Sequence, residues 1–127
     1  MFNKLTVFQL SSAMANHAGK RQALVAQNIA NADTPDYKAQ DLEAFDTALQ
    51  KSSDFEWSTT RKTHITPSSV MNASNIVQDS PGGVEPNGNT VSIDNEMLRA
   101  VDVQKQHSRA IAIYKSAMTI LRTSVKG

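Results

Sequence analysis

The chain has 127 residues, a net charge of +1 and no cysteine, and 39% of its residues are apolar. That apolar share is below the roughly 45–50% of ordinary globular domains, so the core must be thin. The lack of cysteine excludes a disulfide framework and a cysteine-rich zinc site. No stretch approaches the roughly 18 apolar residues of a membrane span, and the first 22 residues lack the apolar region of a cleavable secretory signal.

The small net charge hides an uneven distribution along the chain. Residues 1–31 carry +3, residues 32–91 carry −5 and residues 92–127 carry +3. The basic residues form no dense stripe, so this pattern is a weak signal for nucleic-acid binding. It is compatible with self-association or with packing among charged neighbours.

The first predicted element is a helix from about Thr6 to Ala30. Apolar residues recur along it at spacings of three, four or seven, with Arg21 interrupting the stripe. The stripe consists of Val7, Leu10, Met14, Ala18, Val25 and Ile29.

A junction of the sequence NIANADTPDYKAQ, residues 28–40, follows this helix. Asn31 is suited to a left-handed C-cap, and Pro35 cannot continue a helix. The four residues from Thr34 to Tyr37 are expected to form a type I turn with proline second. Asn28 and Asn31 should bond to backbone groups, while Tyr37 supplies an amphipathic ring of the kind found at interfaces. A plain helix stop is the alternative interpretation of this segment.

The middle of the chain gives weaker signals. A short helix is predicted after a cap at Asp41, with Leu42, Phe45 and Leu49 on one face. Residues 51–91 are predicted to be irregular, because three of the four prolines and the run PGGVEPNGN fall there. Short β pieces are possible around Trp57 and Ile65.

The last predicted element is a helix of about 34 residues from Ile93 to Lys126. Ser92 is its expected N-cap, and Asp94 and Glu96 suit the positive end of the helix dipole. A heptad seam with alternating spacings of 3 and 4 runs along it. The seam comprises Met97, Ala100, Gln104, His107, Ile111, Tyr114, Met118, Leu121 and Val125.

These elements predict a mainly α protein. Its long terminal helices are expected to pack as an antiparallel, coiled-coil-like pair, joined by an irregular middle with short helical or β pieces. We divide the single domain into residues 1–50, 51–91 and 92–127. Because two helices alone bury little apolar surface, further copies of the chain or its relatives are expected to cover the rest.

The junction NIANADTPDYKAQD, the segment GNTVSIDNEM at residues 88–97 and the end QKQHSRAIAIYKSAMTILRTSVKG resemble the flagellar axial proteins, the rod and hook components. The short spacing between the helices is similar to that of the shortest rod proteins. The resemblance implies a structural subunit of the proximal basal-body rod, part of the drive shaft that carries torque to the hook. Asp36 departs from the glycine that this family usually has there.

The resemblance also implies partners and a location. The partners are other copies of the chain, other rod proteins, the junction between the MS ring and the rod, and the export apparatus, with no nucleic acid. The location is the periplasmic rod, reached without a cleavable signal peptide. Twelve residues are predicted to lie at subunit interfaces: Asn28, Asn31, Thr34, Pro35, Tyr37, Met97, Gln104, His107, Ile111, Tyr114, Met118 and Leu121.

No residue pattern points to an enzyme, a cofactor or a metal. His17, His64 and His107 lack the spacing of a zinc helix, and the acidic group of Asp41, Glu43 and Asp46 has no accompanying nucleophile. Gln104 and His107 are instead polar seam residues, which often specify register. The alternative functions are that of the other short rod protein of the same family, or of a non-flagellar helical adaptor that binds one partner helix or a nucleic acid.

Overall fold

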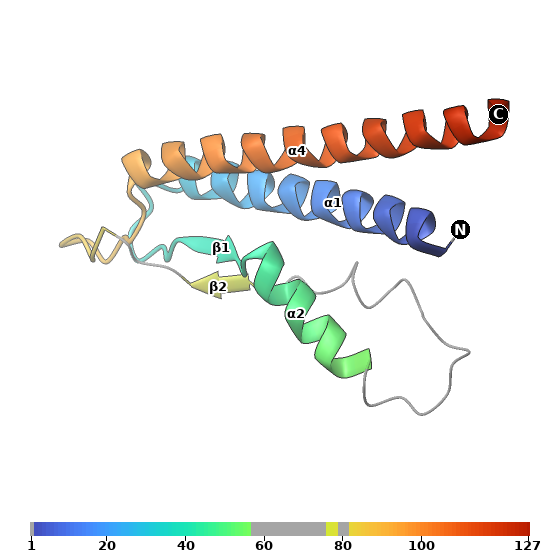
Figure 1. Cartoon of the computed structure of the whole chain (residues 1–127). Helices are drawn as coiled ribbons and strands as arrows, with labels where there is room; N and C mark the ends of the chain where they lie inside the picture. Colours follow the sequence, from blue (N-terminus) through green and yellow to red (C-terminus); the bar gives the residue numbers. More distant parts are fainter. Residues whose placement is uncertain (1, 57–75, 79–81) are drawn as a thin grey trace.

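The computed structural model describes residues 2–56, 76–78 and 82–127. Two long helices, α1 (Phe2–Ala30) and α4 (Ile93–Lys126), lie side by side and run antiparallel (Figure 1). The strand β1 (Gln40–Leu42), the helix α2 (Phe45–Glu56) and the strand β2 (Ile76–Gln78) come between them in the chain. The predicted mainly α fold with its antiparallel helix pair is therefore confirmed.

The boundaries of the elements agree with the predictions to different degrees. Helix α4 has the predicted bounds, whereas α1 begins at Phe2 instead of Thr6. Helix α2 begins only at Phe45, because Asp41 and Leu42 belong to β1, so the predicted cap at Asp41 is wrong. The β pieces predicted around Trp57 and Ile65 lie outside the described residues.

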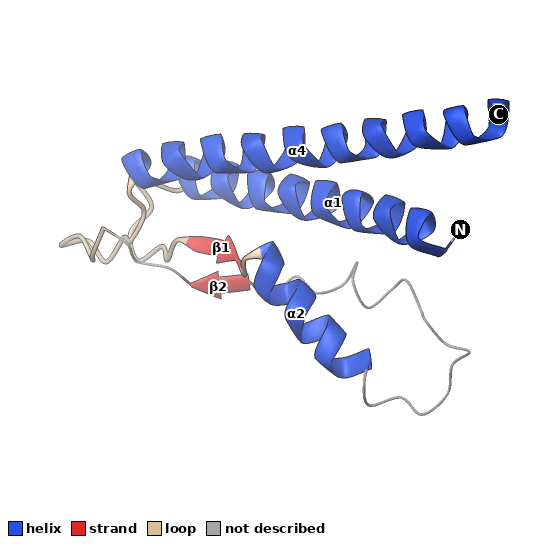
Figure 2. Ribbon diagram, in the orientation of Figure 1, coloured by secondary structure: helices blue, strands red, loops and turns tan. Residues whose placement is uncertain are grey.

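The short sheet packs on α1 (Figure 2). Its two strands are antiparallel, with Gln40 opposite Gln78 and Leu42 opposite Ile76. The Leu42 side chain is buried, whereas Ile76 and Val77 of β2 are exposed. None of the described helices is long and apolar enough to cross a membrane.

The helix pair is held by small residues on both sides of the contact. Ala18 and Val25 of α1 are buried, as are Val103 and Ala110 of α4. Small side chains let two helix backbones approach closely, so the helix interface is densely packed although few large apolar side chains are buried. The predicted stripe of α1 is right in its middle but not at its ends, because Val7 and Ile29 are exposed.

Helix α4 carries two adjacent heptad seams. The seam that faces α1 contains its buried residues, and it lies one residue before the seam read from the sequence. We call it the inner seam: Glu96, Arg99, Val103, Gln106, Ala110, Ile113 and Ala117. Both seams alternate 3 and 4, but a step of one residue turns the helix by about 100°, so they face different directions.

The outer seam, which is the one read from the sequence, is largely open to solvent. Met97 is 61% exposed, and Gln104, His107 and Ile111 are also exposed. Tyr114 is half exposed but turns its ring edge to Phe8 of α1, with the ring centroids 5.3 Å apart. Met118 and Leu121 are half-buried. The inner seam of α4 thus packs within the chain, while the adjacent outer seam presents apolar groups to solvent.

A pair of valine truncations tests this assignment of the two seams. Val103 of the inner seam is 3% exposed, and Val101 is 49% exposed. We expect Val103→Ala to lower the free energy of unfolding by about 1–3 kcal/mol, because it removes two buried methyl groups and leaves a cavity. Val101→Ala is the matched control and should cost much less. Equal losses in urea unfolding followed by circular dichroism would contradict the assignment.

Candidate assembly site at the helix junction

Asn28 stands in the last turn of α1 and is 0% exposed. Its side-chain amide donates to the Gln40 carbonyl at 2.7 Å, and its side-chain oxygen accepts from the Gln40 backbone N–H at 3.0 Å. The same oxygen accepts from the Tyr37 hydroxyl at 3.1 Å. Asn28 therefore takes the place of a neighbouring strand along β1 and joins it to α1, so the prediction of backbone bonds is confirmed.

Asn89 performs the corresponding task from the other side of the junction. It is 0% exposed, and its amide lies within 2.9 Å of the carbonyls of Asn31, Ala32 and Thr34, in the turn after α1. Its side-chain oxygen accepts from the Val91 N–H at 2.7 Å. A buried carbonyl without a donor is costly. One amide thus connects the exit of α1 to the entry of α4.

The strained position in the junction is Asp36. It has φ of 61°, the only positive φ of a described non-glycine residue, and Tyr37 N donates to Thr34 O at 3.4 Å. A positive φ at the third residue is the geometry of a type II turn, so the predicted type I turn is wrong. The Asp36 N–H donates to the Asn87 carbonyl at 3.0 Å, which holds the turn against the chain entering α4.

Gly88 is the close neighbour of that turn. It also has a positive φ, +83°, and a Cβ atom there would run into Oδ1 of Asp36. Its carbonyl accepts from the Lys38 ammonium at 2.7 Å. Glycine is needed here for two separate reasons, the backbone conformation and the lack of a side chain.

The remaining predicted junction residues lie nearer the surface. The Asn31 amide donates to the Gln27 carbonyl at 2.8 Å, and Thr34 Oγ1 donates to Asn31 Oδ1 at 3.2 Å. The predicted left-handed C-cap at Asn31 is wrong, since its φ is not positive. Thr34 and Pro35 are exposed.

Tyr37 is turned inward at its polar end. It is half-buried, and its hydroxyl reaches Asn28 rather than the surface. Burial raises the pKa of the Tyr37 hydroxyl above its usual value of about 10, and the negative charge of Glu96 raises it further. Tyr37 therefore belongs to the same buried polar region as the start of α4.

An ion network crosses the three elements below the junction. Arg21 of α1 makes two bonds to Asp41 of β1, at 2.9 and 3.1 Å. Arg99 of α4 lies 3.7 Å from the same carboxylate and donates to Glu96 at 2.8 Å. Glu96 is 1% exposed, and its Oε2 has no hydrogen-bond partner among the described residues. Removing one member of such a buried network leaves another charge uncompensated.

His17 is held by hydrogen bonds and a ring contact, and it belongs to no potential metal site among the described residues. Its Nε2 lies 2.8 Å from the Glu43 carbonyl and its Nδ1 lies 2.9 Å from the Gln106 amide. A neutral ring protonated at Nε2 satisfies both contacts. The ring also meets Phe45 edge-on, with centroids 5.5 Å apart, which seats the start of α2 on α1. The described residues contain no group of His, Asp and Glu that could hold a metal.

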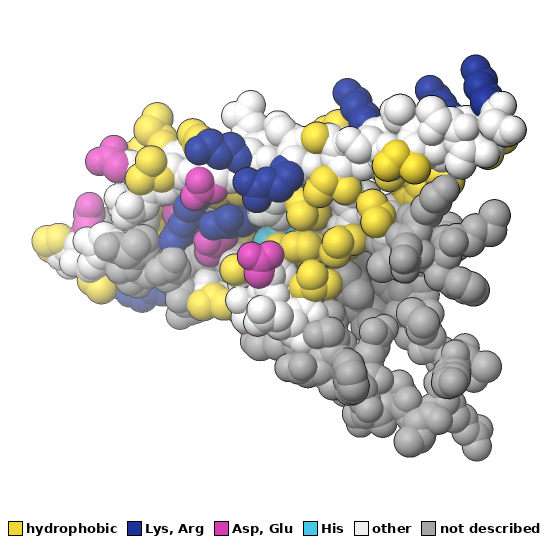
Figure 3. Space-filling view, viewed as in Figure 1, with side chains coloured by type: hydrophobic (Ala, Val, Ile, Leu, Met, Phe, Trp, Pro, Cys, Tyr) yellow, Lys and Arg dark blue, Asp and Glu magenta, His cyan; other side chains and the backbone are white. Residues whose placement is uncertain are grey.

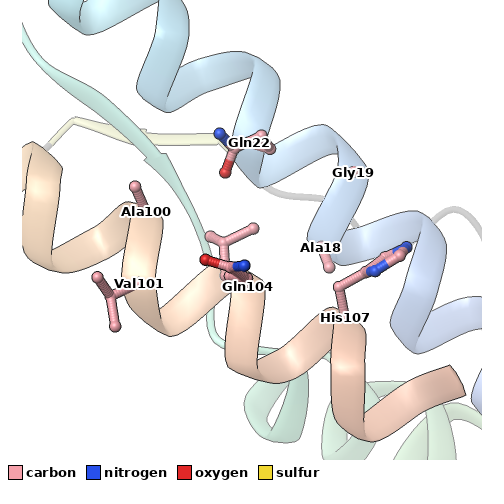
Figure 4. Close-up of a pocket in the computed structure, with 8 residues that line it drawn as sticks. Ala18, Gly19, Gln22, Ala100, Val101, Gln104 and His107 are labelled. Atoms are coloured by element: carbon pink, nitrogen blue, oxygen red, sulfur yellow. The ribbon is translucent and has the colours of Figure 1, made fainter. Parts of the chain in front are cut away.

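A shallow groove of about 470 Å³ lies between α1 and α4. Small residues of α1, Ala18 and Gly19, form one wall, and Ala100, Gln104 and His107 of the outer seam lie on the other (Figure 4). Apolar side chains also gather along the two long helices toward their termini (Figure 3). The groove is therefore lined in part by residues of the outer seam, so the two form one continuous surface.

Reasoning from the sequence missed Asn89, Gly88 and Arg99 as organising residues. The signal that could have identified Gly88 and Asn89 is the motif PNGNT at residues 86–90, in which a glycine and a polar pair come shortly before the helix. Arg99 could have been noticed because it lies three residues after Glu96 on one face of the helix, a spacing that allows an ion pair.

Comparison with known proteins gives consistent matches over the chain. A family model described as flagella basal body rod protein matches residues 10–38, which cover most of α1 and its junction. The chain is 30% identical to the flagellar basal body rod protein FlgB of Agrobacterium fabrum, over 96% of this chain and 94% of the relative. It is 29% identical to FlgB of Bacillus subtilis over the same shares, and 25% identical to FlgB of Buchnera aphidicola over the full length of both.

A comparison of two glycines tests the packing of the turn. Gly83 has φ of +81° with open space around it, whereas Gly88 has φ of +83° with Asp36 in the way. Alanine at either position bears the cost of a left-handed conformation, about 1–2 kcal/mol. We expect Gly88→Ala to lower the unfolding free energy by more than Gly83→Ala, because only the former meets a side chain.

The double variant Gly88→Ala/Asp36→Gly separates the two effects. Since the second change removes the obstructing carboxylate and relieves Asp36, it should recover most of the extra loss. Thermal unfolding of the four proteins measures this. If Gly83→Ala and Gly88→Ala are equally unstable, the contact with Asp36 has no energetic weight.

The raised pKa of Tyr37 predicts a specific alkaline response. Its folded pKa lies above its unfolded value, so the stability it contributes is complete below about pH 10 and is lost as pH rises through the folded pKa. Tyr37→Phe should reduce this alkaline loss while costing about 1 kcal/mol at neutral pH for the hydrogen bond to Asn28. Urea unfolding between neutral and alkaline pH measures both quantities. Tyr114→Phe is the control, and an unchanged pH profile in Tyr37→Phe contradicts the assignment.

Proposed function

Because this chain belongs to the FlgB family of flagellar basal body rod proteins, it is a structural subunit of the flagellar rod, and we propose that it works there by offering helix faces to neighbouring subunits, with no catalytic role. The relatives are named as rod proteins over nearly the whole of their length and of this chain. An isolated adaptor that binds a single partner helix is therefore not the function that we favour.

The observation that carries the mechanism is the exposed outer seam of α4. A heptad seam is a surface that another helix can cover by knobs-into-holes packing. In this chain α1 packs mainly on the inner seam and reaches the outer one at Tyr114, whose ring meets Phe8, while Met97, Gln104, His107 and Ile111 stay exposed. A protein that presents such a face is incomplete by itself and suited to assembly.

We assign the predicted interface residues two different tasks. The outer seam residues form the contact with a neighbour: Met97, Gln104, His107, Ile111, Tyr114, Met118 and Leu121. Thr34 and Pro35 are exposed at the junction and belong to the same assembly surface. Asn28, Asn31 and Tyr37 support it from within, since they hold the turn that positions Thr34 and Pro35.

The finer placement follows from the family resemblance. The chain occupies the proximal part of the rod, among copies of itself and other rod proteins, next to the MS ring and the export apparatus. It lies in the periplasm and transmits torque toward the hook. The FlgB name of the full-length relatives favours this position over that of FlgC, the other short rod protein.

Complementation of a flagellated strain that lacks its own copy of the gene tests this function. The wild-type chain should restore swimming and rods in isolated basal bodies. Ile111→Asn, on the outer seam, should reduce swimming by about tenfold or more, because each subunit of the rod then carries a polar group in an apolar contact. Electron microscopy of basal bodies identifies the step that fails.

Ser108→Asn is the matched control, since it places the same side chain on an exposed position of α4 outside the seam. It should leave swimming unchanged. Normal rods in the Ile111→Asn strain would show that the outer seam does not lie at the subunit interface. Failure of the wild-type chain to restore any rod would contradict the proposed function itself.

A further inference from the structure

The two ends of the molecule carry opposite charge. From Val103 to Gly127 the chain has five basic residues and no acidic one. The acidic side chains Asp33, Glu85 and Asp94 lie at the opposite end, beside the junction. On the face shown in Figure 3, Asp and Glu side chains lie in the half nearer the junction, together with some Lys and Arg, whereas the charged side chains that project from the C-terminal end of α4 are Lys and Arg.

The basic end is a continuous stripe. Lys115, Arg122 and Lys126 are separated by seven and four residues, which places them on one face of α4 over about 16 Å. All three are exposed and make no ion pair with the described residues. Val125, 84% exposed, stands beside them. The stripe therefore offers three cations without an ion pair in the described part of the chain, beside one exposed apolar group.

The acidic end is hollowed. A groove of about 330 Å³ lies between the turn after α1 and the start of α4, and Asp33, Glu85 and Asp94 line it. All three carboxylates are exposed and form no ion pair within the part of the chain that the structure describes. Ile93, 51% exposed, contributes an apolar wall. The groove therefore offers three negative charges and one apolar surface.

We propose that the basic C-terminal stripe of α4 in one copy docks in the acidic junction groove of the next copy, so that subunits associate head to tail. Three cations meet three carboxylates, and Val125 meets Ile93. The contact joins two different patches of the same chain, so it does not close after two copies and generates an open chain with one polarity. This inference rests on the proposed function, for which it supplies the direction of stacking.

The charges also determine how the contact responds to salt. Exposed ion pairs are weak individually and are screened when the Debye length falls toward the distance between them. They act mainly on the choice and orientation of the partner. A groove full of carboxylates rejects a second acidic end, and two basic stripes repel each other, so parallel like-to-like contacts are disfavoured.

Sedimentation of the purified full chain over a concentration series tests the proposal. At low ionic strength the average mass should rise continuously with concentration, and about 0.5 M salt should return the chain to the monomer. Arg122→Glu/Lys126→Glu reverses the stripe and Asp33→Lys/Glu85→Lys reverses the groove. Each variant alone should associate at least about tenfold more weakly, and an equimolar mixture of the two should recover association.

Lys105→Glu/Arg109→Glu is the control, since it makes the same change of net charge on the same helix away from the stripe. It should associate as the wild type does, and circular dichroism should show unchanged helix content in all variants. Association that ignores salt, that stops at a dimer, or that the control weakens equally overturns the proposal.

Expression in the deletion strain separates this proposal from the assigned function. Wild-type rods together with loss of rods in both charge-reversed strains support head-to-tail docking. Normal rods in the charge-reversed strains overturn the docking and leave the rod function standing. Failure of the wild-type chain to restore rods overturns the rod function, whatever the sedimentation result.

Discussion

The amide of Asn89, donated to the carbonyls just beyond α1, is the contact on which the rest of the architecture depends. A helix that ends inside a protein leaves carbonyls that must find donors. Here the donor comes from the segment that enters α4, 58 residues away from Asn31 in the chain. By satisfying that end, Asn89 places Gly88 against Asp36 and directs α4 back along α1. The antiparallel pairing is therefore specified by a polar contact, while small apolar residues supply the packing along its length.

Polar groups also specify the relation of β1 to the helix pair. Asn28 satisfies both backbone groups of Gln40, and Asp41 collects Arg21 and Arg99 from the two helices. Such partly buried networks contribute less to stability than to the choice of one arrangement over others, which we hold as the role of this one. All copies of a rod subunit must have the same relative placement of helices and strands. Regular contacts between chains therefore require a well-defined arrangement within each chain.

The division of α4 into two seams connects this architecture with assembly. The inner seam uses Glu96 and Arg99 near the junction and small residues farther along, and it is filled by α1. The outer seam holds larger apolar groups together with Gln104 and His107, and it is largely exposed apart from Tyr114, which meets Phe8 of α1. A free monomer gains little from exposing Met97 or Ile111, and we propose that a subunit surrounded by neighbours buries them. The chain therefore has a thin core by itself, but it carries exposed apolar residues that suit contacts with neighbouring subunits.

The sequence by itself determined the two long helices, the end of α1 at Ala30, the bounds of α4 and the family, because periodicity and a contiguous motif are local properties. It also indicated that Asn28 would find backbone partners. Only the tertiary structure decided which seam of α4 faces α1, that Asp36 and not Asn31 takes the left-handed conformation, and that Leu42 lies in a strand. The physical reason is that two seams with the same 3–4 spacing differ only by a rotation of the helix. Contacts distant in sequence, from Asn89 and from the Arg21–Asp41–Arg99 network, select that rotation.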